Sequence, residues 1–184
     1  MKITLLSASI TGSKSRLALE DAKKYLLKHA PVAEITLLDL KEMTILFADG
    51  RNYVDYPADT GILTKNLMDA DIIVIATPTF QASIPGTLKN VFDLLPQQAF
   101  FHKIVSLIIS AGSPKHFLMA ENQLKPILHY MKANTLPNYL FIEEQDFANG
   151  TIINSEVHRR LNNLMEETIV LFDAYQTIWQ KQKK

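Results

Sequence analysis

The sequence contains no cysteine, and this absence removes several classes of chemistry at once. Without thiols the chain forms no disulfide, holds no thiolate-bound metal and offers no cysteine nucleophile. The histidines are also poorly spaced for a metal, because they form neither H-x-x-x-H nor H-E-x-x-H. They are His29, His102, His116, His129 and His158. We therefore expect no metal site and a chain suited to a reducing compartment.

The chain also has no excess of charge of either sign, because 19 lysines and arginines balance 19 aspartates and glutamates. A balanced chain has no field to attract nucleic acid or an anionic membrane, and it differs from small acidic electron carriers. Long apolar runs are absent as well. The N-terminal stretch MKITLLSASITG turns polar too soon for a signal peptide, and no segment reaches the length of a membrane span. We expect a soluble, cytoplasmic protein with no nucleic-acid and no membrane partner.

Five short runs rich in β-branched and other apolar residues recur along the chain. They are KITLLSA (2–8), AEITLLDL (33–40), DIIVIATP (71–78), KIVSLIISA (103–111) and NYLFIEE (138–144). The third and fourth runs are almost continuously apolar, which is typical of strands buried on both faces of a parallel sheet. Helical periodicity in the remaining segments predicts helices over 15–29, 61–69, 85–95, 116–132 and 155–180. For the third helix, Ser83 is the candidate N-cap and Pro85 lies in the first turn.

Strand and helix thus alternate five times, and this alternation predicts the fold class. We expect an α/β protein with a flavodoxin-like three-layer sandwich, in which a five-stranded parallel sheet of order 2-1-3-4-5 carries helices on both faces. With 184 residues, 47% of them apolar, the chain fits one domain over 1–184. The segment 41–60 is too long for an ordinary connection, so we expect it to be functional or mobile.

The stretch SASITGSKSR (7–16) leaves the first predicted strand and enters the first predicted helix. A Walker loop needs glycine where Ala8 and Ser13 stand, and a dinucleotide loop needs more glycine than the single Gly12. Its hydroxyls and Lys14 instead suit a terminal monophosphate at a helix N-terminus, a position that favours anions. The alternative is a helix cap with solvated polar residues around it.

Two further loops follow the third and fourth predicted strands. TPTFQASIPGTLKNVFDLLP (77–96) places Phe80 and Gln81 in a turn, and ISAGSPKHF (109–117) places Ala111 and Gly112 before Pro114. The carboxyl ends of neighbouring parallel strands share one crevice, where an exposed aromatic ring and an amide would suit a flat heterocycle. The alternative for Phe80 is a place in the core.

Groups that could carry out chemistry by themselves are missing from these loops. The sequence has no G-x-S-x-G elbow, no clear carboxylate pair and no other recognisable base constellation. A binding crevice without an acid, a base or a nucleophile indicates that a cofactor supplies the chemistry.

SASITGSKSR together with TPTFQASIPGTLKNVFDLLPQQAFFHKIVSLIISAGSPKHFLMAENQLKPIL resembles the NAD(P)H-dependent FMN reductase family, in particular the short flavin reductases of alkanesulfonate utilisation. The resemblance implies a flavodoxin-like subunit that binds FMN and passes hydride from NAD(P)H to the flavin, and on to free flavin, a quinone or an azo compound. It also implies a homodimer or homotetramer, with an electron acceptor or a partner monooxygenase. No catalytic acid or base is assigned, because hydride transfer between stacked rings needs alignment more than a base.

The same resemblance assigns residues to the cofactor. The phosphate would be held by Ser9, Thr11, Ser13, Lys14 and Ser15, the ribityl chain and ring would lie along Pro78, Thr79, Phe80 and Gln81, and the other edge of the ring would meet Ala111, Gly112 and Ser113. Independently of the resemblance, a 2′-phosphate of NADPH could meet Lys14, Arg16 or Arg51, and the alternative is that these exposed basic residues are only solvated.

One position departs from the family pattern. Members from sulfonate systems commonly carry a tyrosine, in a π-bulge linked to flavin release, at or beside the place of Asn122. The departure argues against the sulfonate pathway and against release of reduced FMN.

Two other functions are compatible with the fold, namely a non-enzymatic flavodoxin-like FMN electron carrier and a flavin-free binding module.

Overall fold

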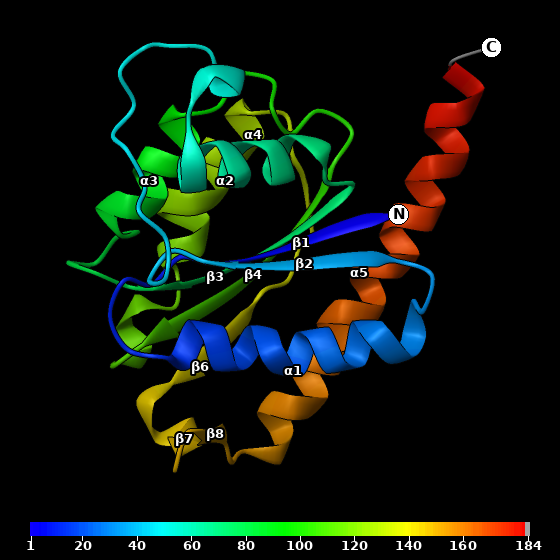
Figure 1. The fold of residues 1–184 in the computed structure, drawn as a ribbon. Coiled ribbons are helices and arrows are strands. Elements are labelled where there is room, and N and C mark those ends of the chain that lie inside the picture. Colours follow the sequence, from blue (N-terminus) through cyan, green and yellow to red (C-terminus); the bar gives the residue numbers. More distant parts are fainter. Residues whose placement is uncertain (183–184) are drawn as a thin grey trace.

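A parallel sheet of order β2-β1-β3-β4-β5 forms the centre of the protein in a computed structural model, which describes residues 1–182 and the side chains of residues 1–179 (Figure 1). Its strands are β1 (Lys2–Ser7), β2 (Glu34–Asp39), β3 (Ile72–Pro78), β4 (Ile104–Ala111), β5 (Asn134–Thr135) and β6 (Leu140–Glu143). The predicted strand order and the parallel pairing are confirmed. A separate antiparallel pair joins β7 (Phe147–Ala148) to β8 (Thr151–Ile152).

The fifth place in the sheet is shared by two short strands. β5 pairs with the start of β4 at Ile104 and Val105, and β6 pairs with the end of β4 from Ile108 to Ala111. The prediction of one strand over 138–144 is therefore wrong in its extent. Pro137, which has no N–H to donate to a ladder, lies in the interruption between them.

Helices cover both faces of the sheet, so the fold has three layers (Figure 1). They are α1 (Lys14–His29), α2 (Ala58–Asp69), α3 (Gly86–Asp93), α4 (Lys125–Tyr130) and α5 (Ser155–Gln182). The helices α2, α3 and α4 pack on one face, and α1 and α5 pack on the other. β4 is buried along its whole length, as its continuous apolar run predicted.

The long helix α5 buries its apolar stripe within the same chain. Leu161, Leu164, Phe172 and Trp179 are all less than 10% exposed and belong to the core between α5, α1 and the sheet. Val170 and Ile178 of the same helix are 61% and 49% exposed, so part of the apolar surface of α5 lies outside this core.

The segment 116–132 is not the continuous α-helix that its periodicity predicted. A 3₁₀ turn at Pro114–His116 precedes a π-helix over Ala120–Leu124, and only the last part, α4, is α-helical. Pro126 cannot donate to the carbonyl of Asn122 four residues earlier, and the N–H of Lys125 donates to Ala120 O, five residues back. A π-helix is therefore present here with asparagine, not tyrosine, in it.

The start of α3 also differs from prediction. Pro85 is itself the N-cap, while Ser83 exchanges backbone hydrogen bonds with Phe80 in the preceding turn, at 2.9 Å in each direction. That turn takes Ser83 away from the helix end, so it cannot act as the cap.

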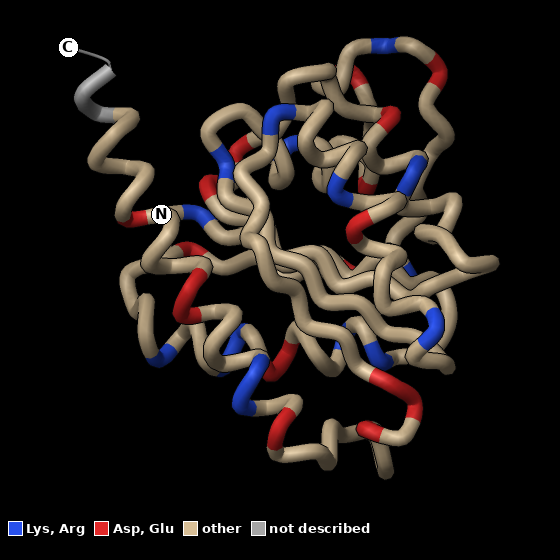
Figure 2. The backbone as a smooth tube through the Cα atoms, turned by 180° about the vertical axis from the view of Figure 1, so that it is seen from behind, with Lys and Arg blue, Asp and Glu red and all other residues tan. Residues whose placement is uncertain are grey.

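Lysines and arginines alternate with aspartates and glutamates along the backbone in Figure 2, with no separation by sign. Within residues 1–182, no helix combines the length and the apolar character needed to cross a membrane.

Candidate functional site

The loops after β1, β3 and β4 meet at the carboxyl edge of the sheet and enclose a cavity of about 330 Å³. It is lined by Ser9, Thr11, Gly12, Ser13, Lys14, Ser15, Pro78, Thr79, Phe80, Ser110, Ala111, Gly112 and Glu144. The strand order reverses between β1 and β3, and ligands of doubly wound folds bind at such a switch point. Of the predicted site residues, Gln81 and Ser113 are the two that do not line the cavity.

Both of these residues lie next to the cavity in turns. Gln81 and Ala82 form the tip of the Phe80–Ser83 turn with φ of +49° and +61°, which is unfavourable for residues other than glycine. Ser113 Oγ accepts a hydrogen bond from Lys115 N at 3.3 Å. Phe80 is 37% exposed and lines the cavity, so its alternative place in the core is wrong.

The first loop presents the open end of α1 to the cavity. Gly12 has φ of +73°, the left-handed conformation that glycine adopts without strain. Ser13 is the N-cap, yet its hydroxyl makes no capping hydrogen bond, and the first turn of α1 contains no acidic residue. The alternative of a simple helix cap is therefore wrong for Ser13. The amide N–H groups of this first turn and the helix dipole are available to an anion.

Two buried hydroxyl groups in this cavity lack a hydrogen-bond partner. Within the described part of the chain, the buried side-chain atoms without a partner are Ser15 Oγ, Thr79 Oγ1 and Thr87 Oγ1. Ser15 is only 2% exposed, and both Ser15 and Thr79 line the cavity. Because an unpaired buried hydroxyl is costly, these atoms indicate a polar ligand that accepts hydrogen bonds there.

Sequence reasoning missed Gly12, Ser110 and Glu144 as lining residues. Ser110 lies directly before the predicted Ala111, and Glu144 directly follows the last residue of β6. Both therefore stand at carboxyl ends of parallel strands, the signal that located the other loops and that should have been applied to the fifth run.

The basic residues near the site are already paired with carboxylates. Lys14 Nζ forms an ion pair with Glu144 Oε2, and Arg51 pairs with Asp49. Arg16 contacts Glu20, Asp39 and Glu42, and its pKa is raised chiefly by the hydrogen bond to Glu20. The hydrogen bonds from Arg51 hold the pKa of Asp49 well below its usual range. None of the three basic residues considered for a 2′-phosphate is without a counter-charge.

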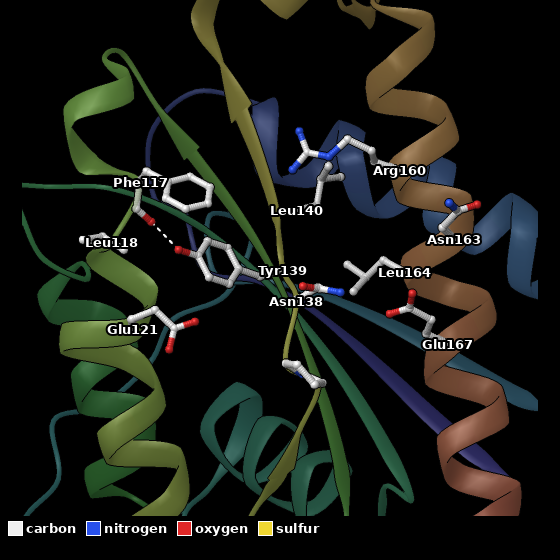
Figure 3. Close-up of a pocket in the computed structure, with 11 residues that line it drawn as sticks. Phe117, Leu118, Glu121, Asn138, Tyr139, Leu140, Arg160, Asn163, Leu164 and Glu167 are labelled. Carbon is white, nitrogen blue, oxygen red and sulfur yellow. Dashed lines mark hydrogen bonds between the residues drawn. The ribbon is translucent and has the colours of Figure 1, made fainter.

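A second cavity, of about 450 Å³, lies at the edge of the sheet between the π-helix and α5 (Figure 3). Phe117, Leu118 and Glu121 border it on one side, Arg160, Asn163, Leu164 and Glu167 of α5 on the other, with Tyr139 between them. Tyr139 donates its hydroxyl hydrogen to Phe117 O, and burial raises the pKa of this tyrosine. No buried hydroxyl without a partner lines this cavity in the described part of the chain, so it lacks the sign of a ligand that marks the first one.

Metal chemistry has no candidate in residues 1–182, where no three histidine, aspartate or glutamate side chains gather as a metal site would require. A hydroxyl-lined cavity at the open end of α1, beside the switch point of a doubly wound sheet, is the arrangement in which proteins of this fold class hold an anionic group.

Comparison with known proteins gives the family. Residues 1–147 match the NADPH-dependent FMN reductase family, and the chain belongs to it. It is 35% identical over 170 residues to an NAD(P)H-dependent FAD/FMN reductase of Geobacillus thermodenitrificans, covering 92% of each chain. It is 28% identical over 176 residues to an NADH-dependent FMN reductase of Pseudomonas fluorescens, covering 95% of this chain and 94% of that one.

A solved structure also superposes well. The crystal structure of an NADH:FMN oxidoreductase in its apo form has a TM-score of 0.78 and 25% identity, covering 91% of this chain and 87% of that one. The protein is thus an oxidoreductase that uses FMN and NAD(P)H, and not a non-enzymatic electron carrier or a flavin-free binding module.

Proposed function

We propose that the cavity at the carboxyl edge of the sheet holds FMN, within a single domain spanning residues 1–184. The observation that carries this proposal is the pair of buried hydroxyls without partners, Ser15 Oγ and Thr79 Oγ1, in the same cavity as Lys14. A phosphate at the N-terminus of α1 and a ribityl chain along Pro78 and Thr79 would accept hydrogen bonds from these two groups.

The assignment covers each predicted site residue. Ser9, Thr11, Ser13, Lys14 and Ser15 take the phosphate, Pro78, Thr79 and Phe80 the ribityl chain and ring, and Ala111 and Gly112 the other edge of the ring. Gln81 and Ser113, in the turns beside the cavity, would reach the ring only from outside its present lining. FMN supplies the redox chemistry, accepting a hydride from NAD(P)H and giving electrons to an acceptor. The protein binds and orients, and we assign it no catalytic acid or base.

Each part of the cavity has its own task in this arrangement. The amides of the first turn of α1 and the hydroxyls of Ser13 and Ser15 fix the phosphate. The half-exposed ring of Phe80 supplies an apolar surface at the mouth of the cavity. The Phe80–Ser83 turn is closed by its own backbone hydrogen bonds, so it positions that surface rigidly.

The test is binding and turnover by the purified protein. We expect FMN to bind, as measured by quenching of flavin fluorescence, and NADH or NADPH to be oxidised when FMN is present. The variant Ser15→Ala should bind FMN about tenfold more weakly, since it removes one hydrogen bond to a charged group. The matched control Ser155→Ala, at the exposed start of α5, should bind as the parent does. Binding by Ser15→Ala equal to that of the parent would contradict the assigned phosphate site.

The assembly and location are further proposals. We propose a homodimer or homotetramer, supported by a groove of about 570 Å³ between α3 and α4 that combines apolar residues, among them Ile127 and the 64% exposed Tyr130, with the Lys89–Asp93 ion pair. A second copy of the chain is the proposed occupant, and light scattering that finds only monomers would contradict it. A cytoplasmic location is supported by the absence of cysteine.

The acceptor is proposed as free flavin, a quinone or an azo compound, and a partner monooxygenase would take reduced FMN if it leaves the protein. Parallel assays with NADPH and each acceptor separate these outcomes. Turnover that requires added FMN and then saturates with it indicates a flavin-supplying reductase.

A further inference from the structure

The cavity assigned to FMN contains one acidic side chain where a phosphate is expected. Among the described residues that line it, Lys14 alone is basic and Glu144 alone is acidic. Their side chains form an ion pair, and Lys14 Nζ also lies 5.7 Å from the centre of the Phe147 ring. The one charge in the cavity that favours a phosphate is thus already neutralised from within the chain.

Glu144 is brought to the cavity by an ordered segment. It begins the short 3₁₀ helix Glu144–Asp146, in which Glu143 N donates to Asp146 Oδ2 at 2.9 Å. Asp146 is 8% exposed and also accepts a hydrogen bond from Asn154 Nδ2 at 2.7 Å. The backbone under Glu144 is therefore fixed independently of Lys14, while the Glu144 side chain itself is 69% exposed.

Other positive charges do not replace Lys14. Arg16, two residues along α1, is bound to Glu20, Asp39 and Glu42. A phosphate that reaches the ammonium of Lys14, which has three donors, must therefore share it with the carboxylate of Glu144 or displace that carboxylate. Because exposed ion pairs are weak, the phosphate still binds, but its affinity falls by about two- to fivefold.

We propose that Glu144 lowers the affinity of the protein for FMN by competing with the phosphate for Lys14. This inference rests on the proposed function. It extends that function, because it attributes the affinity for the phosphate to the opposing effects of Lys14 and Glu144. Riboflavin, which shares the ring and ribityl chain but has no phosphate, is not subject to the competition.

The experiment compares flavin binding by the parent, Glu144→Gln and the control Glu156→Gln, using quenching of FMN and of riboflavin fluorescence. Glu156 is an exposed glutamate that pairs with Arg159 on α5, so the control makes the same charge change outside the cavity. We expect Glu144→Gln to bind FMN about two- to fivefold more tightly. Riboflavin binding should be unchanged in both variants, and FMN binding unchanged in the control.

A double-mutant cycle with Lys14→Gln tests whether the effect of Glu144 on FMN binding depends on Lys14. Lys14→Gln should weaken FMN binding, and adding Glu144→Gln to it should produce little further gain. Unchanged or weaker FMN binding by Glu144→Gln, or an equal gain without Lys14, would overturn the competition. Failure of the proposed function looks different, since the parent itself would then bind neither FMN nor riboflavin.

Discussion

Polar groups at the two ends of the sheet differ in whether they have hydrogen-bond partners within the chain. At the amino ends, Lys103 Nζ donates to Met68 O and Ala70 O, both at 2.6 Å, and Lys2 N donates to Asp71 Oδ2 at 2.8 Å. At the carboxyl ends, the hydroxyls of Ser15 and Thr79 are buried without a partner. These polar groups at the amino ends are paired within the chain, whereas the two hydroxyls at the carboxyl ends are available to the proposed ligand.

This difference predicts that substitutions at the two ends separate binding from stability. Changes at the carboxyl ends should alter flavin binding while the fold persists. Changes at the amino ends should lower the free energy of unfolding and leave flavin binding alone. The following predictions test that separation, beginning with the largest expected effect.

Replacing Ser15 by aspartate should reduce FMN affinity by about a hundredfold or more, because a carboxylate then faces the phosphate. An acid in the first turn of α1 interacts favourably with the helix dipole, so the fold should persist. Fluorescence titration measures the affinity, and urea unfolding measures the stability. Riboflavin is the control ligand, and an equal loss of riboflavin binding would show that Ser15→Asp disturbs the whole cavity.

Replacing Lys103 by methionine should lower the free energy of unfolding by about 2 kcal/mol, since two carbonyl groups at the end of α2 lose a charged donor. The exposed Lys65→Met is the matched control and should change stability little. FMN affinity should match that of the parent in both variants. A folded Lys103→Met protein with weakened FMN binding would contradict the expectation that the amino ends of the sheet affect stability and not flavin binding.

Replacing Ala82 by glycine should raise the free energy of unfolding by about 1 kcal/mol, because it relieves a left-handed conformation that alanine resists. The control Ala48→Gly, where φ is not positive, should not stabilise the protein. We expect the stabilised variant to bind FMN somewhat more weakly, since a glycine loosens the turn that presents Phe80. Tighter FMN binding would show that the strain serves no purpose at the site.

The smallest effect concerns the pH dependence of stability. Burial lowers the pKa of Lys103 below its ordinary 10.5, against the opposing charges of Asp71 and Asp69. The unfolded chain then binds this proton more tightly, so the contribution of Lys103 to stability rises with pH between the lowered pKa and about 10.5. Urea unfolding from pH 8 to pH 10.5 should show the parent gaining stability relative to Lys103→Met.

The sequence predicted the sheet order and most of the cavity because both follow from local patterns. Continuous apolar runs identify parallel strands, and the carboxyl ends of such strands meet at one edge. The hydroxyls of the first loop and the turn at Phe80 were therefore identifiable from their places in the chain.

The remaining features depend on contacts between distant residues. The end of the fifth run places Glu144 at the same edge of the sheet as Lys14, but residue spacing does not show that their side chains form an ion pair. The π-helix at Ala120–Leu124 differs from an α-helix by one residue in its hydrogen-bond pattern, which leaves the apolar periodicity almost unchanged. Pro137 lies between β5 and β6 and is consistent with a break in the strand. The apolar run over 138–144 nevertheless predicted one strand, and it gave no sign of β5, which precedes Pro137.

The split strand also limits how copies of this chain can associate. An edge strand with a continuous row of free N–H and C=O groups invites another chain to extend the sheet, a route to aggregation. Here the row is broken around Pro137, and Lys125 Nζ donates to the Pro137 carbonyl at 2.8 Å. This edge therefore offers no uninterrupted template for strand addition, whereas the opposite edge of the sheet is the continuous strand β2.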